Sequence, residues 1–171
     1  MKQKKQINIY FIDNDNLELD NFRDNFTMKF DYNLFTFNSV EILINKLNAD
    51  VKEKKIKIVI IDYLIRSRGM DITTAVELLP RIKNIDNDIE VIIFADSDNI
   101  ELKTTSGNVK PAAYIRKDTQ YFARLEAVLH RIISGHEMKR KIKNIKKAII
   151  LFVGILVLGT LAFILSVIFK F

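Results

Sequence analysis

The sequence predicts an α/β domain with a doubly wound, five-stranded parallel sheet, followed by one C-terminal transmembrane helix. Three observations support this prediction. Short apolar runs rich in β-branched residues alternate with segments of helical spacing, as in strand–helix–strand units. The runs lack the polar alternation of half-exposed strands, so helices should cover both faces of the sheet. A final stretch of 22 residues carries no charge.

The apolar runs define the expected strands, and the run at 33–37 is the weakest of them. We expect strands at 7–12, 33–37, 56–61, 90–94 and 112–115. Apolar residues recur at helical spacing in the intervening segments 17–26, 40–47 and 72–82. Leu17 opens the first of these helical stripes and Ile72 opens the third. A last helix is expected to open at Thr119.

Composition limits the chemistry that the chain can perform. A chain of 171 residues supports one domain whose core needs neither disulfides nor a structural metal. The sequence has no cysteine, which excludes disulfide frameworks, thiolate metal sites and cysteine nucleophiles. Asp13 ends the first apolar run too early for a secretory signal. We therefore expect a domain that is not exported and has no redox chemistry.

The formal net charge of +6 is concentrated in the C-terminal part of the sequence. Residues 1–128 carry 19 basic and 20 acidic side chains, whereas residues 129–171 carry 8 basic side chains and one acidic side chain. Because the first part is almost neutral, we expect no nucleic-acid partner. The basic excess directly precedes an apolar stretch and therefore indicates a membrane surface.

The apolar stretch 148–169 is long enough to cross a membrane. Its 22 residues, at about 1.5 Å each, cover the roughly 30 Å of a bilayer's hydrocarbon core. The positive-inside rule keeps the folded domain in the cytoplasm, because six basic residues precede the stretch and only Lys170 follows it. The six, which should also attract anionic lipid, are Lys139, Arg140, Lys141, Lys143, Lys146 and Lys147.

Three parts follow from these patterns. We expect a folded domain at 1–134, a basic juxtamembrane segment at 135–147 and a single-pass transmembrane helix at 148–169. The membrane segment contains small residues at Gly154, Gly159, Ala162 and Ser166. Small residues let two such helices approach closely, so a homodimer is one possible arrangement.

Polar residues follow three of the expected strands. Asp13, Asn14 and Asp15 follow the first strand, Asp62 follows the third, and Lys117 follows the fifth. Ligands bind at the carboxyl ends of strands in open parallel sheets. If the strand order is 2-1-3-4-5, Asp13 and Asp62 project into one crevice, where two carboxylates need a cation such as Mg²⁺. Lys117 could then pair with an incoming phosphoryl oxygen.

These residues belong to three longer motifs: Phe-Ile-Asp-Asn-Asp at 11–15, Val-Ile-Ile-Asp at 59–62 and Tyr-Ile-Arg-Lys-Asp at 114–118. In these motifs and their spacing, the sequence resembles the receiver domains of bacterial two-component response regulators, from about Ile7 to Ile133. The resemblance implies a flavodoxin-like sheet of order 2-1-3-4-5 and a receiver-like domain at 1–134. With the apolar tail, it implies a protein of the bacterial inner membrane.

The resemblance also implies roles for individual residues. Asp62 would be the phosphoacceptor, which forms an aspartyl phosphate by attack on phosphorus. Asp13, Asn14 and Asp15 would hold Mg²⁺ together with Asp62. Lys117 would contact the phosphoryl group, Tyr114 corresponds to the aromatic switch residue, and Ala95 stands at the second switch position. The donor would be a histidine kinase or a phosphotransfer protein, and a membrane protein partner would read the result. No enzymatic activity beyond phosphoacceptance is implied.

Departures from the receiver pattern support a second hypothesis. Asn14 replaces the second of two adjacent acids, and Ala95 stands where Ser or Thr usually offers a hydroxyl. Ser97 is a possible substitute for that hydroxyl. The stretch after Asp62 is about two residues longer than usual and has Arg66 where proline is common. The alternative is therefore a degenerate receiver that takes no phosphate and acts as a constitutive membrane scaffold.

Other interpretations of the same residues remain open. Asp15 followed by Glu18 is also a helix-capping pattern, and Tyr114 is also explained as a packed aromatic. Asp13-Asn14-Asp15 matches the Asp-x-Asp of haloacid-dehalogenase-type phosphatases, a third hypothesis. That enzyme class would leave Asp62 without a role, and Leu17 stands where it usually has Thr or Val.

Overall fold

The computed structural model describes residues 7–28, 31–66, 72–95 and 109–169 of the chain. The chain forms two compact units, Met1–Ile132 and Ile133–Phe171. The first unit is an α/β domain. The second consists of the C-terminal part of one long helix.

A five-stranded parallel sheet forms the centre of the first unit. The strand order β2-β1-β3-β6-β7 confirms the predicted 2-1-3-4-5 arrangement of the five main strands. β1 pairs with β3 in register from Ile7 opposite Ile56 to Ile12 opposite Ile61, so these two strands end at the same level. The strands are β1 (Ile7–Ile12), β2 (Tyr32–Phe37), β3 (Ile56–Asp62), β6 (Glu90–Ala95) and β7 (Ala113–Arg116).

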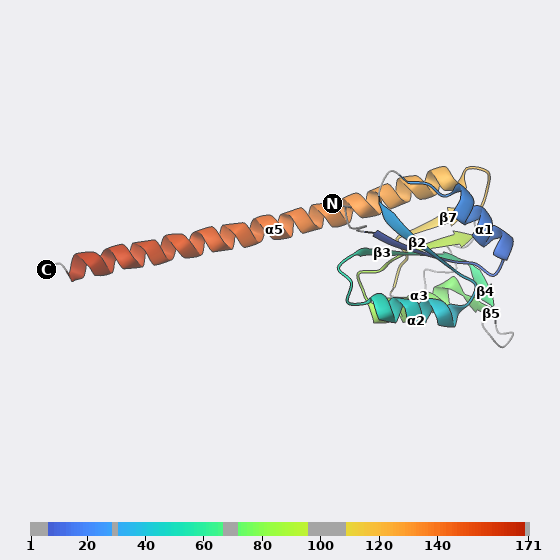
Figure 1. Cartoon of the computed structure of the whole chain (residues 1–171), viewed down its shortest axis with the longest axis horizontal. Coiled ribbons are helices and arrows are strands. Elements are labelled where there is room, and N and C mark those ends of the chain that lie inside the picture. The colour runs from blue at the N-terminus through green and yellow to red at the C-terminus, as the bar shows by residue number, and fades with distance from the viewer. Residues whose placement is uncertain (1–6, 29–30, 67–71, 96–108, 170–171) are drawn as a thin grey trace. The chain divides into compact units, whose positions relative to one another are not determined.

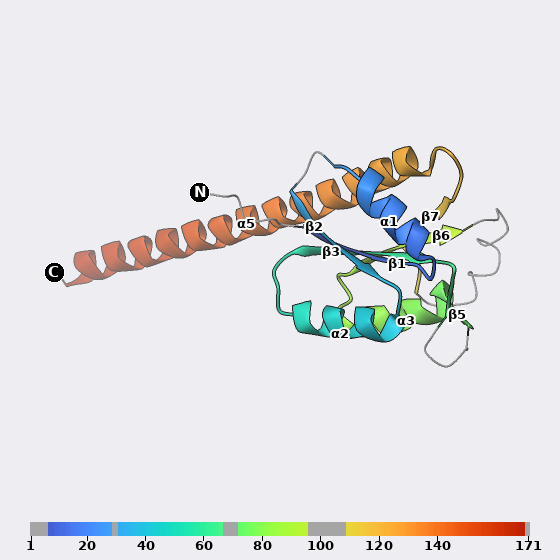
Figure 2. The same cartoon turned by 45° about the vertical axis from the view of Figure 1, so that its right-hand side comes forward.

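Helices cover both faces of the sheet, as the unbroken apolar runs predicted. One face carries α1 and the other carries α2 and α3 (Figures 1 and 2). The first turns of α5 share the α1 face, because the ring centroid of Phe122 lies 5.7 Å from that of Phe22. The helices are α1 (Asn16–Asn25), α2 (Val40–Asp50), α3 (Ala75–Ile85) and α5 (Tyr121–Ile168).

The core has a different character on each face of the sheet. On the α1 face it is aromatic, and Phe11 stacks on Phe22 with ring centroids 4.2 Å apart. On the α2 and α3 face it is mainly aliphatic, with Leu43, Ile61 and Leu79 among its buried members. Every residue of β1 is buried, as expected for an interior strand of a two-faced sheet. Because β1 is held in the core along its whole length, the position of its carboxyl end, which Asp13 follows, is fixed.

Three local expectations differ from the structure. Ile72 belongs to a strand, β5 (Ile72–Thr74), and not to the third helix. β5 pairs antiparallel with β4 (Leu64–Arg66), which makes a hairpin between β3 and α3. Leu17 is 78% exposed and does not join the apolar stripe of α1. The last helix begins at Tyr121 and not at Thr119, because a turn that Asp118 stabilises comes first.

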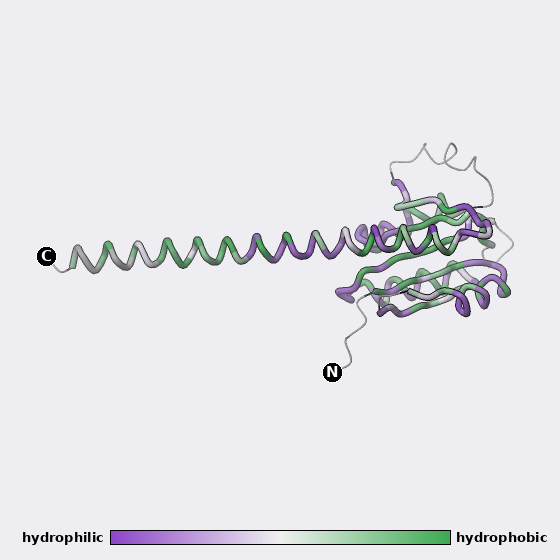
Figure 3. Tube along the Cα trace, turned by 90° about the horizontal axis from the view of Figure 1, so that it is seen from above, coloured by the Kyte–Doolittle hydropathy of each residue, from purple (hydrophilic) through white to green (hydrophobic). Residues whose placement is uncertain are grey.

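The second unit continues α5 through Gly135 to Ile168. Within the described residues, α5 is the one helix that has the length and composition to cross a membrane, and none of its most apolar window is buried in the chain. Figure 3 shows hydrophilic and hydrophobic residues mixed in the first part of this helix, and mainly hydrophobic residues in the described part that follows. The six predicted basic residues from Lys139 to Lys147 are all exposed.

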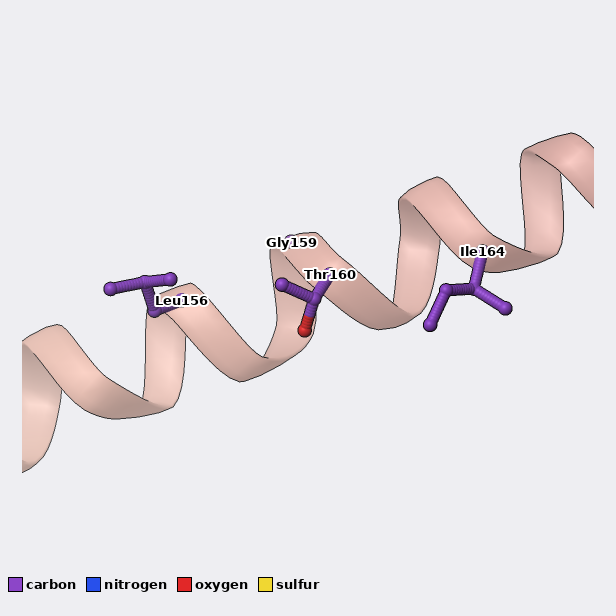
Figure 4. A pocket seen from close by; sticks show the side chains of 4 residues that line it. All are labelled: Leu156, Gly159, Thr160 and Ile164. Carbon is purple, nitrogen blue, oxygen red and sulfur yellow. The ribbon is translucent and has the colours of Figure 1, made fainter.

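A shallow notch interrupts the apolar surface of this helix at Gly159. No heavy atom lies within 4 Å of the position that a Cβ would take there. Leu156, Thr160 and Ile164 line the notch together with Gly159 (Figure 4). The Thr160 hydroxyl donates to the Val157 carbonyl oxygen at 2.8 Å, so its polarity is satisfied within the helix.

Candidate functional site

The polar residues predicted from sequence lie at the carboxyl ends of three strands. Asp13 directly follows β1, Asp62 ends β3 and Lys117 directly follows β7. β1 and β3 are neighbours, whereas β6 separates β3 from β7. Lys117 therefore reaches past the end of β6, where the small residue Ala95 lies and accepts the Lys117 backbone N–H at 3.0 Å.

One ammonium group joins the two carboxylates. Lys117 Nζ lies 2.7 Å from Asp13 Oδ2 and 2.7 Å from Asp62 Oδ1. The side chain of Asp13 is 5% exposed, and those of Asp62 and Lys117 are 19% and 20% exposed. Charge-assisted hydrogen bonds of this length are strong when water has little access. The three residues form the candidate site, and their summed charge is −1.

Burial and pairing act in opposite directions on the two titrating groups. Burial raises the pKa of Asp62, and the Asp13 charge adds to this, although Lys117 and the Leu64 backbone N–H oppose it. For Lys117, burial alone would lower the pKa, but the bonds and charges of Asp13 and Asp62 outweigh it and raise the pKa. The lysine thus stays charged at neutral pH, while the ionised form of Asp62 is disfavoured.

Asp13 is held in place by its own loop. Its Oδ1 accepts the Asp15 backbone N–H at 3.0 Å, and its backbone N–H donates to the Phe37 carbonyl oxygen at 3.1 Å. Asp15 caps α1, because its Oδ1 accepts the Leu17 backbone N–H at 2.9 Å. This is the capping role that the sequence left open, and it fixes the loop around Asp13.

The β4–β5 hairpin follows Asp62 directly and was not predicted. The Asn14 side-chain amide donates to the Leu64 carbonyl oxygen at 3.0 Å, which joins the loop after β1 to β4. The Tyr63 carbonyl oxygen accepts the Ala75 backbone N–H at 2.9 Å, which ties β3 to the start of α3. These contacts hold the backbone that directly follows Asp62.

The two residues predicted to switch lie in neighbouring strands: Ala95 is the last residue of β6, and Tyr114 is the second residue of β7. Ala95 is 4% exposed and presents a methyl group where a hydroxyl was expected in the family pattern. Tyr114 is half-buried and packs against the aliphatic core on the α2 and α3 face. Ser97 lies outside the described residues. A switching role for Tyr114 and Ala95 therefore remains a prediction.

Tyr121 is a site neighbour that the sequence reasoning missed. Its hydroxyl donates to Glu18 Oε1 at 3.1 Å, which joins the first turn of α5 to α1. Burial raises the pKa of Tyr121, and the charges of Glu18 and Asp13 raise it further. The sequence signal was its position four residues after Lys117, in the first turn of the last helix.

The candidate site offers a divalent cation the carboxylate oxygens of Asp13 and Asp62. Within residues 7–28, 31–66, 72–95 and 109–169, no group of three or more His, Asp or Glu side chains is arranged to hold a metal. Two carboxylates do face one cation, the Lys117 ammonium. Mg²⁺ commonly takes one or two carboxylates and completes its shell with water and phosphate oxygens. Asp13 and Asp62 therefore fit a site of that minimal kind.

Comparison with solved structures finds the same architecture elsewhere. The signal receiver domain of an HD domain-containing protein from Pseudomonas fluorescens Pf-5 matches with a TM-score of 0.61 at 15% identity, over 82% of this chain and 96% of that one. A receiver domain protein from Clostridium thermocellum matches with a TM-score of 0.58 at 19% identity, over 77% and 98%. The chain has the receiver fold.

A third structure shows how this fold occurs within a longer protein. Full-length FixJ from B. japonicum matches with a TM-score of 0.59 at 18% identity, over 78% of this chain but 61% of that chain. No protein-family model and no curated protein matches the sequence. At these identities the likeness establishes the receiver fold, and the activity has to be argued from the site.

Proposed function

We propose that the chain is a membrane-anchored receiver of a two-component phosphorelay that accepts a phosphoryl group on Asp62. The observation that carries the proposal is the shared lysine: Lys117 Nζ lies 2.7 Å from both Asp13 and Asp62 at the carboxyl edge of a receiver-type sheet. Ligand sites of open α/β sheets occur at this edge. The donor is a histidine kinase or a phosphotransfer protein.

The chemical step uses Asp62 as a nucleophile. One of its oxygens attacks the phosphorus of a phosphohistidine, a P–O bond forms and the P–N bond breaks. The electron pair of the broken bond goes to the donor's protonated imidazole, which leaves as a neutral group. Lys117 Nζ already contacts Asp62, so it stands next to the phosphoryl oxygens as they arrive. Asp13 holds the lysine there through its second bond.

Mg²⁺ is the cofactor that this proposal includes. Asp13 and Asp62 would hold it, and when bound it would neutralise charge on the phosphoryl oxygens. Asn14 weakens the metal's attraction to the site, because its amide is neutral and donates to the Leu64 carbonyl oxygen at 3.0 Å. Asp15 contributes as the α1 cap that positions Asp13.

The C-terminal half of α5 is proposed to be the membrane anchor. It is apolar, none of its most apolar window is buried in the described part of the chain, and six basic residues precede it. The positive-inside rule places the folded domain on the cytoplasmic side of the bacterial inner membrane, with a single pass. The domain then signals by contact with a membrane protein partner. The notch at Gly159 allows close packing against another helix, including that of a second copy.

A second candidate function has its own support. Ala95 supplies no hydroxyl for a phosphoryl oxygen, and Lys117 already neutralises much of the charge of the two carboxylates. Such a site can be stable without metal or phosphate. The domain would then be a constitutive scaffold at the membrane, with the same fold and the same anchor.

Phosphorylation in vitro separates the two functions. The full chain in detergent is incubated with Mg²⁺ and a small-molecule phosphodonor and is then run on a phosphate-affinity gel. The wild type should give a shifted band that Asp62→Ala lacks. Asp88→Ala is the matched control, because Asp88 is an exposed acid that lies before the amino end of β6, at the opposite edge of the sheet from the site. No shift in either the wild type or Asp62→Ala would exclude the phosphoacceptor function and leave the scaffold as the remaining candidate.

A further inference from the structure

The segment 138–149 of α5 is amphipathic. Its apolar residues Met138, Ile142, Ile145 and Ile149 recur at steps of four, three and four residues, which places them in one stripe along an α-helix. The four side chains are 62%, 48%, 59% and 57% exposed. An exposed apolar stripe of this kind calls for an apolar surface to cover it.

A basic stripe runs beside the apolar one. Lys139, Lys143 and Lys146 recur at steps of four and three residues, and at 100° per residue they fall within about 60° of one another. All three are exposed. No Asp or Glu follows Glu137 in the sequence. The helix therefore has no acidic side chain after that residue that could neutralise the three lysines. The segment therefore presents an unbalanced positive face next to exposed isoleucines.

The charges decide which surface covers the stripe. Steps of four and three also occur in coiled coils, in which a second copy of the chain would cover the stripe. In that register the positions flanking the stripe are Lys139, Lys141 and Lys146, and a parallel pair would set Lys141 of one copy against Lys146 of the other. Like charges at these positions oppose pairing. A surface that is apolar inside and anionic outside satisfies both stripes at once.

We propose that residues 138–149 form a binding site for anionic phospholipids. Ile142 and Ile145 insert among the acyl chains, and Lys139, Lys143 and Lys146 pair with phosphate groups of the lipid headgroups. The inference rests on the proposed membrane anchor and adds a lipid preference to it. Each basic residue close to an anionic membrane surface strengthens binding to that surface by about fivefold.

The absence of cysteine from the chain permits a single-label test. Asn144→Cys carries a donor fluorophore on the full chain, reconstituted into phosphatidylcholine nanodiscs. The discs contain a trace of acceptor attached to the acyl chain of either phosphatidylglycerol or phosphatidylcholine. Energy transfer to the phosphatidylglycerol acceptor should show at least about fivefold local enrichment over the phosphatidylcholine acceptor. High salt should reduce this enrichment.

Matched variants locate the effect. Combined Lys139→Gln, Lys143→Gln and Lys146→Gln should abolish the enrichment. The control, which removes the same charge from exposed lysines of the folded domain, combines Lys52→Gln, Lys54→Gln and Lys110→Gln. This control should leave the enrichment unchanged.

The outcomes distinguish the lipid site from the anchor. Equal transfer to both acceptors by a chain that elutes with the discs overturns the lipid site and leaves the anchor intact. Failure to elute with the discs overturns the anchor and the lipid site together. Salt-resistant transfer between donor-labelled and acceptor-labelled chains, without lipid preference, would assign the stripe to a second copy and also overturn the proposal.

Discussion

The two ends of strand β3 each hold a lysine–carboxylate contact, but the two contacts differ in charge balance. Near the amino end, Lys57 Nζ lies 2.9 Å from Asp86 Oδ2 and 3.2 Å from the Val51 carbonyl oxygen, and the lysine side chain is 5% exposed. At the carboxyl end, Lys117 is shared by Asp13 and Asp62. One end is neutral and the other carries an excess negative charge.

The pKa values show the consequence of that difference. Burial alone would raise the pKa of Asp86, but the bonds from Lys57 and from the Asp88 backbone N–H outweigh it and lower the pKa. For Asp62 burial prevails, and the pKa is raised although Lys117 donates to it. At neutral pH the ionised Asp86 therefore stabilises the fold, whereas the ionised Asp62 destabilises it. A costly carboxylate at the carboxyl edge of the sheet supports the function proposed for that end.

Removing the lysine at the carboxyl end should have the largest effect on activity. Lys117→Ala deletes the preorganised cation beside Asp62, so the initial rate of phosphorylation should fall by about 100-fold or more. The rate is measured with Mg²⁺ and a small phosphodonor. Lys57→Ala, assayed well below its unfolding temperature, is the control and should keep the wild-type rate. If Lys57→Ala and Lys117→Ala lost the same fraction of the phosphorylation rate, the assignment of activity to the carboxyl end of β3 would be contradicted.

Removing the lysine at the amino end should have the largest effect on stability. Lys57→Ala leaves the Asp86 carboxylate and the Val51 carbonyl oxygen without their cation, which should lower the free energy of unfolding by about 3 kcal/mol. Lys117→Ala should lower it less, because that site is more exposed to water. Urea unfolding of the full chain in detergent, followed by circular dichroism, gives both values. A larger loss for Lys117→Ala would reverse the assignment.

Adding the hydroxyl that the family pattern has at residue 95 should increase the activity of the site at the carboxyl end of β3. Ala95→Ser adds a hydrogen-bond donor at the end of β6, between β3 and β7, and should raise the rate of phosphorylation by about tenfold. Ala75→Ser is a matched control, because Ala75 is also buried but lies at the start of α3. A rate unchanged by Ala95→Ser would mean that residue 95 does not approach the phosphoryl group.

The smallest effect concerns how stability varies with pH. Because folding raises the pKa of Asp62, the cost of its charge is present at neutral pH and disappears as the pH falls toward the unfolded-state value of about 3.9. The stability of Asp62→Asn relative to wild type should therefore be greater at pH 7 than at pH 4.

Asp86→Asn should show the opposite sign, because folding lowers the pKa of Asp86 and its contribution is lost in acid. Parallel urea titrations at the two pH values measure both variants. The same sign for both would contradict the contrast between the two ends of β3.

The fold was predictable because the pattern of apolar runs extends over whole strands and helices. β1 ends at Ile12 as expected, since its apolar run stops at Asp13. The β4–β5 hairpin was missed because strands of three residues are too short to show a period. Leu17 was misplaced because helical spacing alone cannot separate the buried face from an exposed first turn.

The site was predictable in its members but not in its contacts. Asp13, Asp62 and Lys117 follow from strand ends and from the resemblance to receivers. That one lysine touches both carboxylates depends on strand order and on side-chain reach past β6, which no local pattern contains. The Tyr121–Glu18 bond joins residues more than 100 positions apart and was hidden for the same reason.

Chemical trapping of the phosphorylated residue tests the central claim most directly. Acyl phosphates are reduced by borohydride, which converts a phosphorylated aspartate to homoserine, and peptide mass spectrometry then identifies the position. After incubation with Mg²⁺ and a phosphodonor, homoserine should appear at residue 62 in the wild type and should be lost in Lys117→Ala. Homoserine at another aspartate, or at none, would contradict the assignment of Asp62 as the phosphoacceptor.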